Sequence, residues 1–322
     1  MKIIDAIRFV RGAVPTRDHY PQLKHVLIKD KTIRAFNGTI AIQAPISSKL
    51  TAAPQADAFA KAVAATDDKT RLQISKNKGN IVLKMADRKI TVPCIDTEEY
   101  PDIPMDGEHY TFDGELLPAL RDVAPFIAKP PCKPYAQGVM IVNSWAVAGH
   151  MTTLIARRMA AQFPVFLNIP DLMVKELLRI NEEPKDYLIS PHCIVACYEN
   201  GGFVYSKTID MNWPDVFKII DVDDTIEPSV DPALLHAQLK QLKPFSENGM
   251  VQIHKGKIAT TSANKVQAEF ECEGLEGSGF FKIDDLMRVA AVSDGFKLAD
   301  YPERCGFSRG DDVRGVLLGF KA

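Results

Sequence analysis

The segment Pro170–Ile180 reads Pro-Asp-Leu-Met-Val-Lys-Glu-Leu-Leu-Arg-Ile and has the residue pattern of a helix that starts with a proline and an acid. Two further segments, Asp57–Ala65 and Asp284–Val292, also read as helices. The three begin at positions 57, 170 and 284, so they lie 113 and 114 residues apart. A long, nearly constant period is typical of repeated units. The sequence therefore predicts three copies of one structural plan.

A second set of helices precedes the first set in each copy. Apolar residues at helical spacing predict helices over Ile3–Val10, Asp113–Ile127 and Asp231–Leu242. Short apolar or alternating runs separated by turn residues predict strands between the helices. They are His25–Lys29, Thr32–Phe36, Ile40–Ala44, Leu72–Ser75, Asn80–Met85, Lys89–Val92, Gly138–Asn143, Ala146–Ala148, Thr153–Arg157, Tyr187–Ser190, Ile194–Tyr198, Phe203–Thr208, Met250–His254, Lys257–Ser262, Gln267–Glu271 and Val313–Leu318. Each unit is thus a helix, a set of strands, a second helix and more strands, which is an α+β fold.

Proline-rich joints divide the units. Tyr100–Pro104 closes the first unit, and Trp213–Asp215 with the acidic stretch Asp221–Glu227 closes the second. We expect domains at 1–107, 108–222 and 223–322.

The composition is that of an ordinary globular protein. Of 322 residues, 46% are apolar and 25% are charged. No apolar run approaches the roughly 18 residues that span a bilayer, and an acid at Asp5 interrupts the N-terminus where a secretory signal needs apolar residues. We expect a cytoplasmic protein without a membrane partner, whose six cysteines are free thiols.

Charge is distributed unevenly over the helices and the domains. Acids concentrate in the first turns, and basic residues follow them, although the net charge is −2. The first domain has 17 basic and 12 acidic residues and a net charge of +5, whereas the second and third have −3 and −4. Basic side chains expected on the helices are Arg8, Arg11, Lys61, Arg121, Lys175, Arg179 and Lys240. They can form a positive surface for DNA phosphates, or they can simply complement the helix dipoles as solvated charges.

Four segments occur in a fairly specific order and spacing. In chain order they are Arg17-Asp18-His19-Tyr20-Pro21-Gln22-Leu23, Ile95-Asp96-Thr97-Glu98-Glu99-Tyr100-Pro101, Tyr135-Ala136-Gln137-Gly138-Val139 and Gly202-Phe203-Val204-Tyr205-Ser206-Lys207-Thr208-Ile209-Asp210-Met211-Asn212-Trp213-Pro214-Asp215. In these segments the chain resembles the bacterial DNA sliding clamp, the DNA polymerase III beta subunit family. The resemblance spans the whole chain but is divergent.

The resemblance implies a non-enzymatic DNA polymerase processivity factor. Three clamp domains, each with two helices inside and antiparallel sheets outside, would form a ring as a head-to-tail homodimer around double-stranded DNA of any sequence. It also implies the replicative DNA polymerase and the clamp loader as partners. Positions that match DNA contacts of the family are Arg17, Lys84, Arg88, Lys89, Lys133 and Tyr135. A plain solvated charge is the alternative for each of the basic residues among them.

The family also has a pocket for partner peptides. Matching positions are Ala136, Thr152, Leu154, Ile155, Pro214, Ile219, Leu317 and Leu318; the alternative for each is an ordinary core residue. Removing Leu317–Ala322 is expected to abolish peptide binding and to leave the ring intact. The chain departs from the family at Gly149–Ala156 and lacks a C-terminal Met-Pro-Met, so a different peptide preference, as in a specialised or virus-encoded clamp, is expected.

No catalytic motif stands out, and we expect neither a cofactor nor a metal. His192, Cys193 and Cys197 have no spacing typical of zinc ligands, and the acids at 96, 98 and 99 and at 311 and 312 fit solvated turns. Two alternatives stay open: a nucleic-acid-processing enzyme with an unrecognised site, and a non-ring scaffold built from the same domains.

Overall fold

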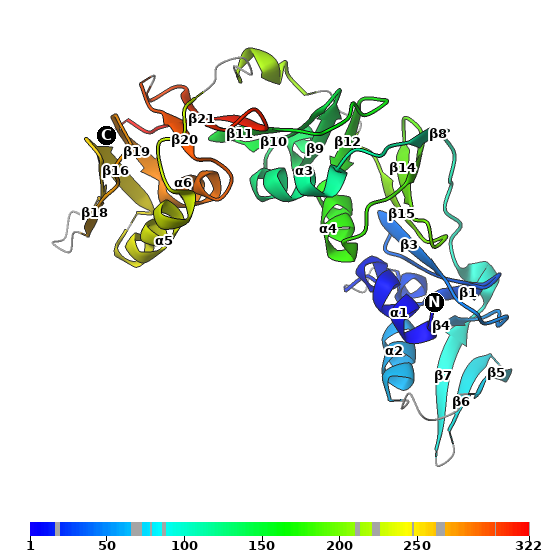
Figure 1. Ribbon diagram of the computed structural model, residues 1–322. Helices are drawn as coiled ribbons and strands as arrows, with labels where there is room; N and C mark the ends of the chain where they lie inside the picture. The colour runs from blue at the N-terminus through cyan, green and yellow to red at the C-terminus, as the bar shows by residue number, and fades with distance from the viewer. Residues whose placement is uncertain are drawn as a thin grey trace. The chain divides into compact units, whose positions relative to one another are not determined.

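The computed structural model describes residues 1–16, 20–65, 73–77, 79–85, 88–209, 213–220, 226–246, 248–261, 268–299 and 301–321. The chain forms two compact units (Figure 1). Unit 1 comprises Met1–Asp113 and Lys175–Thr208, and unit 2 comprises Gly114–Val174 and Ile209–Ala322. Among the described residues, no helix combines the length and the apolar character needed to cross a membrane.

Unit 1 contains two antiparallel sheets and the helices that cover them. Its helices are α1 (Ile3–Val10), α2 (Ala56–Ala64) and the larger part of α4 (Asp171–Ile180). Its strands are β1 (Leu27–Lys29), β2 (Thr32–Phe36), β3 (Ile40–Pro45), β4 (Ala53–Pro54), β5 (Gln73–Asn77), β6 (Asn80–Lys84), β7 (Lys89–Ile95), β8 (Glu108–Thr111), β13 (Asp186–Ile189), β14 (Cys193–Cys197) and β15 (Phe203–Lys207). The sheet orders are β1-β2-β3-β15-β14-β13-β8 and β4-β7-β6-β5.

Unit 2 repeats this arrangement. Its helices are α3 (Leu116–Val123), α5 (Pro232–Leu242) and α6 (Ile283–Ala290). Its strands are β9 (Gly138–Val142), β10 (Trp145–His150), β11 (Thr153–Arg158), β12 (Leu167–Pro170), β16 (Met250–His254), β17 (Lys257–Thr260), β18 (Glu269–Glu271), β19 (Ser278–Lys282), β20 (Gly295–Lys297), β21 (Cys305–Arg309) and β22 (Val313–Leu317). The sheet orders are β12-β9-β10-β11-β22-β21-β20 and β18-β17-β16-β19.

Each seven-stranded sheet joins strands that are distant in the sequence. In unit 1, β3 pairs with β15, with Ile42 opposite Val204. In unit 2, β11 pairs with β22, with Ile155 opposite Gly315. The predicted second domain therefore contributes strands to both large sheets, and the compact units follow the sheets. The expected boundaries near 107 and 222 stay a prediction.

Amphipathic helices bury their apolar faces and leave the charged faces exposed. Ala6, Ile7 and Val10 of α1 are buried, and α1 packs on β2 and β3. Figure 1 shows α3 against one face of the sheet that contains β10 and β11, and α5 beside α6. This division between an apolar and a polar face is the expected behaviour of a surface helix.

The expected α+β class is confirmed, and all six predicted helices are present within a few residues of their bounds. The prediction missed six strands: β4, β8, β12, β19, β20 and β21. The sequence of β8, Glu-His-Tyr-Thr, has little apolar character and is an edge strand. Leu167 to Ile169 of β12 is short and ends at a proline, which is tolerated at a sheet edge.

Candidate functional site

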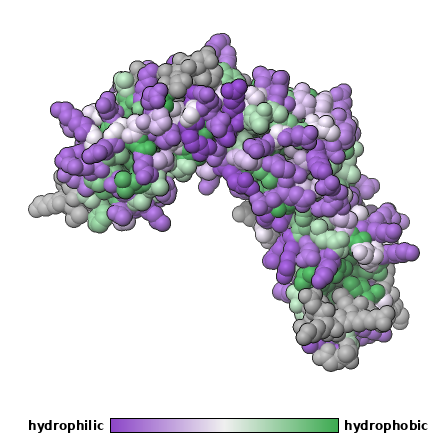
Figure 2. Space-filling view, in the orientation of Figure 1, coloured by the Kyte–Doolittle hydropathy of each residue, from purple (hydrophilic) through white to green (hydrophobic). Residues whose placement is uncertain are grey.

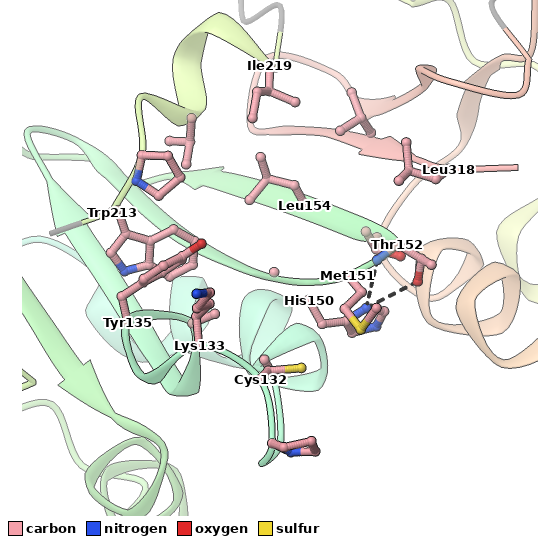
Figure 3. A pocket seen from close by; sticks show the side chains of 18 residues that line it. Cys132, Lys133, Tyr135, His150, Met151, Thr152, Leu154, Trp213, Ile219 and Leu318 are labelled. Atoms are coloured by element: carbon pink, nitrogen blue, oxygen red, sulfur yellow. Dashed lines mark hydrogen bonds between the residues drawn. The ribbon is translucent and has the colours of Figure 1, made fainter. Parts of the chain in front are cut away.

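A cavity with a volume of about 530 Å³ lies in unit 2. Strands β10, β11 and β22 contribute to its walls together with the segments 128–136 and 213–219 (Figure 3). Its lining residues are Ala128, Pro131, Cys132, Lys133, Tyr135, Ala136, Gly149, His150, Met151, Thr152, Thr153, Leu154, Trp213, Pro214, Val216, Ile219, Val316 and Leu318. This volume is in the range of clefts that bind small molecules or peptide side chains.

Most of the cavity wall is apolar. Figure 3 shows Leu154 below Ile219 and beside Leu318, with Tyr135 and Trp213 next to each other. The rings of Tyr135 and Trp213 are 5.3 Å apart, centroid to centroid. Ile219 and Leu318 are 38% and 37% exposed, so apolar surface remains open to solvent at the rim. Exposed apolar side chains around a cavity are typical of a binding site for a partner.

A buried carboxylate on α6 organises one edge of the cavity. Asp285 is 2% exposed and accepts a hydrogen bond from Thr152 Oγ1 at 2.6 Å. The guanidinium of Arg288 donates to the same carboxylate and lies with Nη2 2.7 Å from His150 Nε2. The backbone N–H of Thr152 donates to His150 Nδ1 at 3.3 Å. These contacts fix the turn between β10 and β11, which carries Met151 and Thr152, to helix α6.

The pKa of His150 is lowered by this environment. Partial burial disfavours the charged imidazolium most strongly, and the nearby cations Arg288 and Lys282 act in the same direction. The Asp285 carboxylate opposes them. The lowered pKa favours the neutral imidazole, in which only one of the two ring nitrogens can accept a hydrogen bond. The contacts of Nδ1 with Thr152 N–H and of Nε2 with Arg288 therefore depend on the tautomer.

The structure brings together six of the eight residues expected in a peptide pocket. Ala136, Thr152, Leu154, Pro214, Ile219 and Leu318 line the cavity. Ile155 and Leu317 do not line it and are 0% and 1% exposed, so the structure places these two side chains in the core. The reason is strand alternation: their neighbours Leu154 and Val316 face the cavity, and consecutive side chains point to opposite faces.

Several lining residues were not anticipated. Trp213 was part of a quoted motif but was taken only as the end of a domain, and Val316, Val216 and His150 had no distinguishing local signal.

The structure explains why the motif at 135–139 has a glycine at position 138. A Cβ atom there would lie 2.5 Å from the carbonyl oxygen of Ile169, so β9 and β12 can approach closely only at a glycine.

The C-terminal segment is part of the fold as well as of the cavity. Leu318 N donates to Thr152 O, Gly319 N to Pro302 O and Phe320 N to Phe280 O, each at 2.8 Å. Tyr301 Oη also donates to the carbonyl of Phe320. Removing Leu317–Ala322 would shorten β22 by one residue and remove these bonds, so the deletion would disturb the fold as well as the cavity. The expectation that the ring stays intact after this deletion stays a prediction.

The structure places Lys133 and Tyr135 at the cavity, and their expected DNA contacts stay a prediction. Both line the cavity, and Tyr135 is half-buried against Trp213, with its carbonyl accepting a hydrogen bond from Asn168 Nδ2 at 3.0 Å. Tyr135 is thus a wall residue, whereas the exposed Lys133 supplies a positive charge at the cavity.

The expected basic side chains on the helices are exposed. Figure 2 shows mostly hydrophilic side chains over the helices in this view. The exposed residues are Arg8, Arg11, Lys61, Arg121, Lys175, Arg179 and Lys240. Arg179 also has a structural role: it donates to Glu176 at 2.7 Å and to the carbonyls of Arg8 and Phe9 at 3.3 and 2.6 Å, which ties α4 to the end of α1. Its expected contact with DNA stays a prediction.

A basic hairpin is also present in unit 1. Strands β6 and β7 pair with Lys84 opposite Lys89, and Met85 N donates to Arg88 O. All three basic residues are exposed. Like charges directly across a strand pair repel, so this site would be stabilised by an anion. Arg17 lies outside the described residues, so its expected DNA contact stays a prediction.

The residues considered for catalysis or metal binding have structural roles. Asp96 accepts from Glu98 N at the start of a short 3-10 turn, and Asp311 and Asp312 pair with Arg314 and Arg157. Cys193 is buried beside Ser190. The described part of the chain contains no group of three or more His, Cys, Asp or Glu residues that could hold a metal.

No protein-family model matches the chain, and no curated protein matches it either. Several solved structures match the chain. A sliding clamp from Caulobacter crescentus is 17% identical with a TM-score of 0.85, and one from Pseudomonas aeruginosa bound to griselimycin is 16% identical with 0.83. The DNA polymerase beta subunit of Streptococcus pyogenes is 16% identical with 0.82. Each match covers 99% of this chain and 97% of the other. The chain therefore has the fold of the bacterial DNA polymerase III beta sliding clamps.

Proposed function

We propose that the protein is a DNA sliding clamp that acts as a processivity factor for a replicative DNA polymerase. The observation that carries the proposal is the match to solved clamps over 99% of this chain and 97% of theirs. In this role the chain forms a closed ring with a second copy of itself, and a clamp loader places the ring on DNA. In this proposal it acts without a catalytic function of its own.

Binding to DNA in this proposal is topological and electrostatic. Exposed basic groups on the helices and on the β6–β7 hairpin attract phosphates without reading base edges, so the ring can slide along the duplex. The cavity in unit 2 receives apolar side chains of an extended peptide from the polymerase or another partner. The DNA-facing groups and the partner cavity thus belong to separate surfaces.

Retention on circular DNA tests the ring directly. The protein is diluted and reconcentrated with a nicked plasmid, so that dissociated subunits can close around the duplex, and is then separated by gel filtration. A clamp remains with the circular plasmid and leaves it after a single restriction cut. Equal retention on cut and uncut DNA would instead indicate ordinary binding and would refute the clamp. Sedimentation distinguishes a ring from a monomeric scaffold, because only the ring requires a dimer.

Charge reversal on the β6–β7 hairpin, compared with the same change at another turn, tests whether the hairpin contacts DNA. Replacing Lys84 and Lys89 by Glu should shorten retention on the circle and reduce its dependence on salt, because phosphate contacts release bound counterions. Replacing Lys255 and Lys257 by Glu changes charge equally at the β16–β17 turn and should leave retention unchanged. If both double variants behave like the wild type, the hairpin has no role in holding DNA.

A further inference from the structure

A second cavity of about 450 Å³ adjoins the first one in unit 2. Its lining residues are Ile219, Pro302, Glu303, Arg304, Val316, Leu318, Gly319 and Lys321. Three of them, Ile219, Val316 and Leu318, also line the first cavity. The two cavities therefore adjoin at these apolar side chains, and the pair of cavities is called the groove below.

The two parts of the groove differ in charge. The first cavity has an apolar wall and one exposed cation, Lys133. The second has two exposed cations, Arg304 and Lys321, against one acid, Glu303. Neither cation has an ion pair within the described part of the chain. This excess of positive charge favours an anionic group on whatever fills the groove.

Strand register places one of these cations beside the apolar rim. Cys305 of β21 pairs with Leu317 of β22, so Arg304 and Leu318 are the next residues beyond the same end of that strand pair. The bond from Gly319 N to Pro302 O continues the pairing outward. A chain that leaves the first cavity over Leu318 therefore arrives next to Arg304 and Lys321.

We propose that the groove selects partner segments that combine apolar anchors with a carboxylate. The anchors fill the first cavity, and the carboxylate, either an acidic side chain or a free C-terminus, is bound by Arg304 and Lys321. This inference rests on the proposed function, because it concerns the partner peptides of the same site. It adds a chemical requirement beyond apolar anchoring.

Arginine and lysine suit this role in different ways. The arginine fork can donate two parallel hydrogen bonds to a carboxylate, and the lysine adds a mobile point charge. Because both side chains are exposed, solvent and salt weaken the attraction. We expect the carboxylate to raise affinity by about five- to tenfold at low salt.

Selection from two randomised peptide libraries tests the proposal. One library displays the variable segment internally, and the other displays it at a free C-terminus. Apolar residues followed by Asp or Glu should be enriched in the first library if side-chain carboxylates are bound. Apolar residues close to the terminus should be enriched in the second if the terminal carboxylate is bound.

The variant Arg304→Gln/Lys321→Gln separates this inference from the proposed pocket. Its affinity for a selected peptide should fall about five- to tenfold and should equal that of wild type for the same peptide with its carboxylate amidated. Arg304→Glu/Lys321→Glu should recover binding when the peptide carries lysine in place of the acid. The control Lys255→Asn removes a charge away from the groove and should bind like the wild type.

The outcomes are distinguishable. Enrichment of apolar residues without any preference for a carboxylate would overturn the inference and leave the pocket in place. A carboxylate preference that persists in the Arg304→Gln/Lys321→Gln variant would overturn it as well. Failure of both libraries to enrich any peptide would overturn the pocket of the proposed function together with the inference.

Discussion

The two seven-stranded sheets are built alike, and in the second a cavity of about 530 Å³ opens at the central junction. In unit 1 the junction is β3 with β15, and in unit 2 it is β11 with β22. A segment between predicted domains packs near each junction. Ile103 joins Ala41, Phe203 and Tyr205 in a buried cluster in unit 1. In unit 2, Val216 and Ile220 join a cluster with Ala156.

The difference lies in how the covering segment closes the surface. In unit 1, Ile103 is 8% exposed, so its side chain is almost completely enclosed. In unit 2 the segment 213–220 forms a 3-10 turn at Val216–Lys218 and leaves Leu154, Ile219 and Leu318 partly open to solvent. The comparison indicates that the path of the connecting segment, more than the sheet itself, turns a junction into a binding site. The following predictions test that explanation.

The largest expected effect follows from shortening a buried side chain at the closed junction of unit 1. Ile103→Ala should lower the free energy of unfolding by about 3 kcal/mol, because it removes buried methylene groups and leaves a void. Chemical denaturation and hydrogen exchange of the amides of β3 and β15 measure the effect. Ile103→Val serves as the graded control and should cost about 1 kcal/mol. Unchanged exchange in the alanine variant would contradict the view that Ile103 seals this junction.

A substitution at the open junction of unit 2 should change the affinity for a peptide more than the stability of the protein. Leu318→Asp should weaken binding of a library-selected peptide about 100-fold, because it places a charge among apolar anchors. Titration calorimetry measures the affinity. Leu234→Asp on α5 is the control, since Leu234 is also apolar and is 55% exposed but does not line the cavity. If the two substitutions weaken binding equally, the cavity is not the peptide site.

An ion-pair network fastens α3 to the second junction. Asp122 lies 3.0 Å from Arg157 Nε and 2.6 Å from Arg309 Nη2, and Arg157 Nη1 lies 3.0 Å from Asp312. Asp122→Asn should destabilise the protein by about 2 kcal/mol, because it leaves two half-buried guanidinium groups without their shared countercharge. Thermal unfolding measures this cost. The exposed pair Asp215–Lys218 is the control, and Asp215→Asn should cost less than about 0.5 kcal/mol.

The smallest expected effect is a pH dependence at the cavity edge. Because burial lowers the pKa of His150, the unfolded chain takes up a proton at a higher pH than the folded chain does. The stabilising contribution is complete above about pH 6.5 and is lost as the pH falls towards the lowered pKa. His150→Gln should flatten the decline of the unfolding midpoint below pH 6.5, whereas the variant His192→Gln, at an exposed histidine, should not. Identical slopes in wild type and His150→Gln would refute this contribution.

Residues of the quoted motifs show how much local sequence could predict. Tyr100 was identified as part of a domain ending, and in the structure it is buried with its hydroxyl donating to Arg34 O, so burial raises its pKa. Ser206 and Trp213 likewise have fixed places, in β15 and on the cavity wall. The place of Tyr135 on the cavity wall was not predicted, because a local motif does not state which distant ring, here that of Trp213, will pack against it.

The sequence by itself determined the α+β class, the six helices, the repeating plan and most strands, because apolar periodicity and turn residues act over short distances. Only the tertiary structure decided that β11 pairs with β22, that Ile155 and Leu317 point away from the cavity, and that Arg179 binds the carbonyls at the end of α1. The physical reason is that these features depend on strand register and on contacts between residues more than 100 positions apart. A local pattern does not encode such contacts, because the same strand or helix can form whichever distant segment it later packs against.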